Sequence, residues 1–190
     1  DPTLLLDLFV DAAHELIALG CDGLTKNCGF LELIQDELAK RVPVPVAVSS
    51  LMQIPSVQKM LPSDKRVGVI TISAESLTDA HLRAAGVDDP SQVPVVGTDA
   101  GRAFTHGILD DQPTIDYDAC KLDLADAASD LMAKAPDVGA IVLECTNMVP
   151  YAADIRKQTG LPVYSIYSLV TWFQQGLLPR KFPFELDDPR

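Results

Sequence analysis

The chain has 190 residues, of which 47% are hydrophobic and 22% charged, and its net charge is −12. This length suffices for one large core or two small lobes, and the composition is that of a soluble globular protein. The negative charge leaves no basic surface for phosphates, which argues against nucleic acid as a partner. No apolar run approaches the roughly 20 residues of a membrane span, and the first residues do not resemble a secretory leader, so we expect a cytoplasmic protein without membrane contact.

Apolar periodicity and turn residues predict helices that alternate with short strands, the order typical of an α/β protein with mostly parallel sheets. Helices are expected over 4–19, 31–41, 77–85, 99–109, 117–135, 151–158 and 169–176. Strands are expected over 45–49, 67–72, 94–96, 140–144 and 162–166. The first helix should bury Leu5, Leu8, Phe9, Ala12, Leu16 and Leu19 on one face, and Trp172 should pack the last helix against the sheet.

Two stretches of the chain follow one pattern of strand, cysteine, helix and strand. A Pro-Val pair begins 17 residues after Cys28, at Pro45, and another begins 17 residues after Cys145, at Pro162. Any βαβ unit has a similar rhythm, so spacing alone does not prove a duplication. Cysteines at the same point of both units favour one.

A duplication predicts two pseudo-symmetric Rossmann-like lobes with the active site between them. Residues 1–66 and 167–190 would form the first lobe, and residues 67–166 the second. The second unit is preceded by two predicted strands, whereas the first is preceded only by a helix. We therefore expect two strands and a helix upstream of Asp1 that this sequence does not contain.

Cys28 and Cys145 both follow predicted strands and precede predicted helices. In parallel α/β sheets ligands bind beyond the carboxyl ends of the strands, where helix N-termini lower the pKa of a thiol and attract a carboxylate. Inverting a carbon beside a carboxylate requires a base on one face and an acid on the other, and two like residues from two lobes can supply both. The pair is therefore our candidate acid and base.

The remaining cysteines and the histidines have no comparable position. Cys21 and Cys120 do not follow strand ends and are expected to be structural, and all four cysteines are expected to be free thiols. No CxxC or Cys/His cluster predicts a metal site. The histidines fall in predicted helices, which favours packing or solvated roles.

Two segments carry a resemblance to a known family. Segment 141–148, Ile-Val-Leu-Glu-Cys-Thr-Asn-Met, resembles the second active-site signature of aspartate/glutamate racemases, in which a Cys-Thr pair ends an apolar strand. Segment 24–30, Leu-Thr-Lys-Asn-Cys-Gly-Phe, is similar to the first cysteine segment of the hydantoin-racemase-like branch of that superfamily. The resemblance covers nearly the whole chain.

This resemblance implies a two-base racemase or epimerase that uses Cys28 and Cys145 on a small carboxylate, with no pyridoxal phosphate, other cofactor or metal. It also implies the residues that would bind substrate. Those at the carboxylate would be Asn27, Gly29, Thr146 and Asn147, with Ser49, Ser50, Ser73 and Ser76 on nearby loops.

Two departures from the amino-acid racemases leave the substrate open. Those enzymes usually have Asn-Thr where this chain has Gly29-Phe30, and an acid or His where it has Asn147. Maleate-isomerase-like chemistry with one nucleophilic cysteine, decarboxylation with one cysteine, and a non-catalytic small-anion binding module are the alternatives. Retention of both thiols favours racemisation or isomerisation. A homodimer is a possible oligomeric state.

Overall fold

The computed structural model describes residues 5–26 and 28–181, and the description below is confined to them. Its strands form two sheets in which every described pair is parallel. The smaller sheet joins β1 (Leu24–Thr25) to β2 (Val46–Ala47). The larger has the order β4-β3-β5-β6, with β3 at Arg66–Thr71, β4 at Val95–Gly97, β5 at Val138–Leu143 and β6 at Val163–Tyr164. The α/β class with parallel sheets is confirmed.

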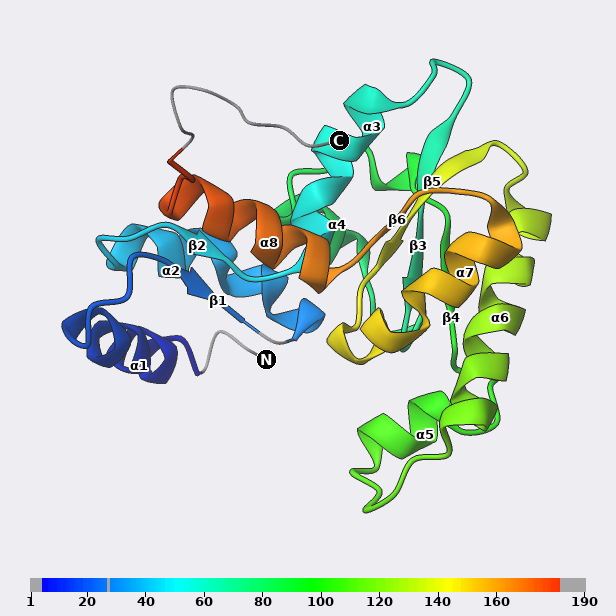
Figure 1. Ribbon diagram of the computed structural model, residues 1–190, viewed down its shortest axis with the longest axis horizontal. Coiled ribbons are helices and arrows are strands. Elements are labelled where there is room, and N and C mark those ends of the chain that lie inside the picture. The colour runs from blue at the N-terminus through cyan, green and yellow to red at the C-terminus, as the bar shows by residue number, and fades with distance from the viewer. Residues whose placement is uncertain (1–4, 27, 182–190) are drawn as a thin grey trace.

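Helices alternate with these strands along the chain (Figure 1). The α-helices are α1 (Leu6–Ala18), α2 (Gln35–Arg41), α3 (Ile54–Met60), α4 (Asp79–Ala84), α5 (Phe104–Leu109), α6 (Tyr117–Lys134), α7 (Ala152–Thr159) and α8 (Ile166–Leu177). Four 3-10 helices are η2 (Gly29–Ile34), η3 (Ser50–Gln53), η4 (Pro90–Gln92) and η5 (Thr146–Tyr151). No helix of the described ranges is long and apolar enough to span a bilayer.

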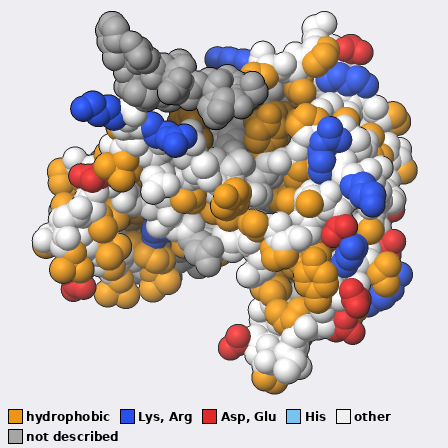
Figure 2. Space-filling view, viewed as in Figure 1, with side chains coloured by type: hydrophobic (Ala, Val, Ile, Leu, Met, Phe, Trp, Pro, Cys, Tyr) orange, Lys and Arg blue, Asp and Glu red, His pale blue; other side chains and the backbone are white. Residues whose placement is uncertain are grey.

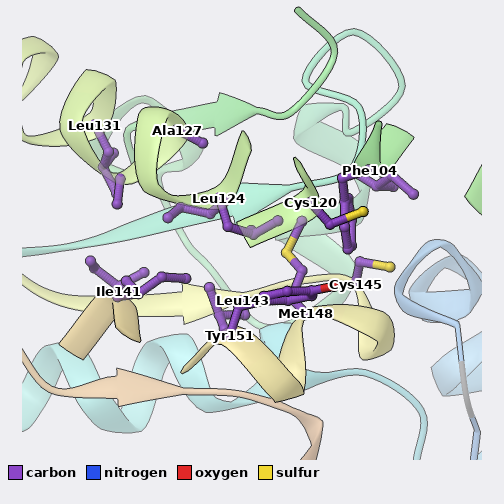
Figure 3. Packing of buried hydrophobic residues seen from close by; sticks show 14 of the residues in the cluster. Phe104, Cys120, Leu124, Ala127, Leu131, Ile141, Leu143, Cys145, Met148 and Tyr151 are labelled. Carbon is purple, nitrogen blue, oxygen red and sulfur yellow. The ribbon is translucent and has the colours of Figure 1, made fainter. Parts of the chain in front are cut away.

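The larger sheet is covered by helices on both faces. Successive residues of a strand point to opposite sides, so each face has its own set of apolar side chains. From β5, Ile141 and Leu143 pack with α6 and α7, whereas Ala140 and Val142 pack with α3 and α4. Figure 3 shows the first of these clusters, with Leu124 and Leu131 of α6 facing the strand. This sheet therefore has a core on each side.

The smaller sheet has a separate core with α1 and α2, in which Leu24, Leu38 and Val48 are buried. After β6, helix α8 returns across the molecule and contacts β2, η3, η5 and β6 (Figure 1). It therefore ties the two sheets together. The predicted lobe boundaries, 1–66 with 167–190 and 67–166, stay predictions.

Two helices differ from the sequence-based expectation. Helix α3 was not predicted, although Pro55 in its first turn is a favourable start and Ile54 and Val57 are buried. The helix expected over 99–109 begins only at Phe104. There the Asp123 carboxylate accepts hydrogen bonds from the backbone N–H groups of Arg102, Ala103 and Phe104, which holds the preceding turn outside the helix.

Two packing predictions were wrong. Helix α1 buries Val10 and Ala13, while Leu8 and Leu19 of the predicted core face are 65% and 83% exposed. Figure 2 shows hydrophobic side chains gathered over this helix. Trp172 is 70% exposed, and Leu169 is the residue of α8 that reaches the core. Both helices are apolar on more than one face, so periodicity did not identify the buried side.

Candidate active site

Cys28 and Cys145 occupy equivalent positions in two equivalent units. The register joins residues 22 positions apart in both, Leu24 to Val46 and Ile141 to Val163. Each cysteine stands four residues after the first member of its pair and immediately precedes a 3-10 helix of 6 residues. The spacing noted in the sequence therefore corresponds to a structural repeat.

The segment after Cys28 packs directly against the strand end that precedes Cys145. A Cβ added at Gly29 would collide with the Glu144 side chain, so a larger residue there would require Glu144 to move. Phe30 packs against the cores on both faces of the larger sheet and meets the His81 ring edge-on at 5.4 Å. The two cysteine segments thus meet where the sheets adjoin.

The thiol of Cys145 lies in an apolar and acidic environment. The residue is 9% exposed, and in Figure 3 its sulfur points away from the hydrophobic cluster. Burial, together with the smaller effects of the charges of Glu144 and Cys28, raises the pKa of Cys145 to about 12, although hydrogen bonds from the backbone and side chain of Asn147 oppose the rise. The expectation that a helix start would lower this pKa was wrong for the free protein, because desolvation outweighs the N–H groups.

Cys28 differs in both exposure and neighbours. It is exposed, and its charge interacts with the Lys26 ammonium and with Cys145. The Nζ atom of Lys26 lies over the Phe9 ring, 2.8 Å from its centroid. The charges of the two thiols therefore act on each other, and the charge of Cys28 also acts on Lys26.

Glu144 links the end of β5 to the end of β3. Its Oε2 accepts a hydrogen bond from Thr71 Oγ1 at 2.8 Å and one from the Ile72 N–H at 3.4 Å. Burial raises the pKa of Glu144, and these two bonds offset part of the rise. A carboxyl group of the second cysteine segment thus lies against Gly29 of the first.

A second buried acid lies under the first cysteine segment. Glu32 of η2 is 0% exposed, and neither carboxyl oxygen has a hydrogen-bond partner among the described residues. Burial, with a smaller effect of the charge of Asp36, raises the pKa of Glu32 to about 8, although the Ser49 hydroxyl opposes the rise. This acid therefore holds its proton at neutral pH.

The predicted serines fall into two groups. Ser49 and Ser50 are 1% exposed: Ser49 caps η3 by accepting the Leu51 N–H, and Ser50 Oγ donates to the Leu143 carbonyl at 2.6 Å. Both stabilise the architecture beside the site. Ser73 and Ser76, after β3, are joined by a hydroxyl hydrogen bond of 3.0 Å. Their contact with a substrate stays a prediction.

The remaining predicted residues lie on the two cysteine segments. Thr146 is half-buried and Asn147 exposed, and Asn147 is hydrogen-bonded to Cys145 as described. Gly29 is buried against Glu144. Asn27 lies outside the described residues.

An open pocket of about 330 Å³ adjoins both segments. It lies between the end of β1, η5 and the start of α8. It is lined by Thr25, Lys26, Val149, Ile166, Tyr167 and Val170. Neither Cys28 nor Cys145 lines this pocket.

Sequence reasoning did not assign a role to Lys26, Glu32 or Glu144. Lys26 and Glu144 stand inside the two quoted segments, so proximity to the cysteines was an available signal. Glu32 carried no signal, because its burial depends on how η2 packs against neighbouring elements.

Several solved structures have the same arrangement of helices and strands. Three of them align with 90% to 93% of this chain. An arylmalonate decarboxylase variant aligns with a TM-score of 0.64 at 15% identity, over 93% of this chain and 76% of its own. A glutamate racemase from Bacillus anthracis gives 0.62 at 14% identity, over 93% and 66%. An allantoin racemase from Pseudomonas fluorescens gives 0.59 at 18% identity, over 90% and 69%. This chain has the aspartate/glutamate racemase fold.

The curated proteins that are similar to this chain in sequence are named as lyases and not as racemases. A dimethylsulfoniopropionate lyase of Durusdinium sp. clade D is 29% identical over 163 residues, covering 84% of this chain and 54% of the relative. Dimethylsulfoniopropionate lyase 7 of Emiliania huxleyi is 30% identical over 185 residues, covering 93% and 54%. The chain thus spans about half the length of these relatives. No model of a known protein family matches it.

Proposed function

We propose that this protein is a lyase that removes the proton beside the carboxylate of a 3-sulfonio acid, with dimethylsulfoniopropionate as the substrate. The Cys28 thiolate takes the proton from C2, and the electron pair of that C–H bond forms the C2=C3 double bond. The C3–S bond breaks with its electron pair on sulfur. The products are acrylate and dimethyl sulfide, so atoms and charge balance without a cofactor.

The observation that carries this proposal is the inequality of the two thiols. Cys28 is exposed and its charge interacts with that of Lys26, whereas Cys145 is buried, and burial and the charge of Glu144 raise its pKa. An elimination needs only one base. The dimethyl sulfide that leaves C3 is neutral, so no acid has to give it a proton. A racemase must work in both directions and benefits from two similar catalysts. The lyases among the relatives support the same choice.

Racemisation of a small carboxylate is the second candidate. The equal spacing of the two units favours it, since it brings one cysteine from each unit to the same site. Both candidates begin with the same proton abstraction. They differ in whether C3 carries a group that can leave.

The decisive experiment supplies the purified protein with dimethylsulfoniopropionate and measures dimethyl sulfide and acrylate. We expect equal amounts of both products, formed above the uncatalysed rate. A parallel screen of chiral amino acids, hydantoins and 2-substituted dicarboxylates in D2O measures loss of optical rotation. Racemisation without dimethyl sulfide would replace the lyase by the second candidate, and inactivity in both assays would overturn both.

A further inference from the structure

The glycine at position 29 is explained by a close approach and not by the conformation of its backbone. A Cβ built on Gly29 would lie 2.7 Å from Cδ and 2.8 Å from Cγ of Glu144, and nearer still to its Oε1. Gly29 is not among the glycines with positive φ, so its backbone would accept a side chain. The first cysteine segment therefore comes this close to Glu144 because residue 29 has no Cβ.

The side chain that Gly29 meets is held from behind by the end of β3. Its Oε2 accepts the hydrogen bonds from Thr71 Oγ1 at 2.8 Å and from the Ile72 N–H at 3.4 Å. Thr71 is fully buried and Glu144 is 2% exposed, so turning the carboxyl away from these donors would leave buried polar groups unpaired. The Glu144 side chain is therefore a fixed surface for Gly29.

The backbone of the same residue meets a second segment of the smaller sheet. Ser50 Oγ donates to the Leu143 carbonyl at 2.6 Å and lies 3.2 Å from the Glu144 carbonyl, which also accepts from it. Ser50 begins η3, which follows β2, whereas Gly29 begins η2, which follows β1. The segments that follow both strands of the smaller sheet thus meet Glu144, the residue directly before Cys145.

We propose that Glu144 is a positioning residue whose side chain, fixed on β3, holds Gly29 in place and so sets where Cys28 lies relative to Cys145. The length and shape of the side chain do this, and not its charge. Burial raises the pKa of Glu144, so glutamine is a fair mimic of its protonated form. The effect on turnover rests on the proposed function, whereas the contact with Gly29 does not.

The test without substrate follows hydrogen exchange of backbone amides by mass spectrometry of peptides. Glu144→Asp is one methylene shorter and cannot keep both its bonds to β3 and its contact with Gly29. The amides of η2 should exchange about tenfold faster in this variant, the order expected when one buried hydrogen bond or its equivalent in packing is lost, while those of α6 stay unchanged. Glu144→Gln should keep the wild-type rates, as should Glu15→Asp, the same shortening at an exposed residue of α1.

Unchanged exchange of η2 in Glu144→Asp would overturn the proposal, and so would an equal rise in η2 and α6, which would mean a general loss of stability. Equal effects of Glu144→Gln and Glu144→Asp would overturn the claim that shape decides. Thr71→Val removes the hydroxyl donor without changing Glu144 and should also raise the exchange of η2. It keeps the test decisive if Glu144→Asp does not fold, because no rise in Thr71→Val would then contradict the proposal.

A double-mutant cycle measures the consequence for turnover. Gly29→Ala should lower kcat for dimethyl sulfide release about tenfold or more with little change in KM, because a misplacement of about 1 Å can cost about 100-fold. Glu144→Ala clears the space that the added methyl group needs, so in that background Gly29→Ala should lower kcat by no more than about twofold. A residue that only stabilised the fold would lower the melting temperature and leave kcat of the folded protein unchanged.

Equal losses from Gly29→Ala in both backgrounds would overturn the proposal, since the added methyl group would then act on the substrate and not on Glu144. If the wild type releases no dimethyl sulfide, the proposed function fails. The exchange experiment still decides in that case whether Glu144 holds Gly29.

Discussion

Cys28→Ser should lower the rate of dimethyl sulfide release by about 100-fold or more, because loss of a positioned base costs roughly 10² to 10⁴. A serine hydroxyl at this position does not ionise near neutral pH. Cys145→Ser should lower the rate less, since a buried hydroxyl can donate a hydrogen bond as a buried thiol does. Unequal losses are the consequence of unequal surroundings.

Steady-state kinetics on both variants checks this prediction. Cys21→Ser is the matched control, because it makes the same thiol-to-hydroxyl change in a half-buried residue outside both cysteine segments. It should retain the wild-type rate. Equal, complete losses in Cys28→Ser and Cys145→Ser would instead support a symmetric two-base reaction.

Glu32→Gln should make the protein more stable than the wild type at pH 8, by up to about 4 kcal/mol. The Glu32 carboxyl is fully buried, and burial raises its pKa from 4.5 to about 8. Between these two pH values the folded state keeps the proton and the unfolded state does not. Stability therefore falls as pH rises through this window and is level above it.

Glutamine mimics the protonated acid and carries no proton to lose, so the advantage of Glu32→Gln should vanish near pH 5. Urea unfolding followed by circular dichroism at several pH values measures the difference. The same change at Glu37, an exposed residue paired with Lys40 at 2.7 Å, should not reproduce it. Parallel pH curves for the wild type and Glu32→Gln would show that Glu32 does not titrate in this window.

The local pattern of the chain was enough to predict the strand ends that carry Cys28 and Cys145. A short apolar run followed by a cysteine and a helix start is a local feature, and its repetition at equal spacing pointed to the two units. The α/β class followed from the same alternation. These features depend on few long-range contacts, which is why sequence reasoning reached them.

What the sequence could not reveal depends on how the two sheets pack together. The contact of Gly29 with Glu144 joins residues more than a hundred positions apart, and the raised pKa of Cys145 follows from that packing. The same is true of Glu32, whose burial no neighbouring residue signals. Trp172 shows the reverse error, since a large aromatic residue was expected inside and lies exposed.

The sequence pattern also did not single out the activity proposed above. A Cys-Thr pair after an apolar strand is compatible with racemisation, isomerisation, decarboxylation and elimination, because each can use a cysteine beside a carboxylate. The difference lies in the environment of each thiol and in the substrate. Lys26 and Glu144 are the described residues that make these environments unequal.

The central claim is that Cys28 removes a proton from the carbon beside the substrate's carboxylate. The most direct measurement compares dimethyl sulfide release from dimethylsulfoniopropionate deuterated at C2 with release from the unlabelled compound, in the wild type and in Cys28→Ser. The account predicts slower release from the deuterated substrate in the wild type and almost none from either substrate in Cys28→Ser. Equal rates for both substrates, together with wild-type release by Cys28→Ser, would contradict it.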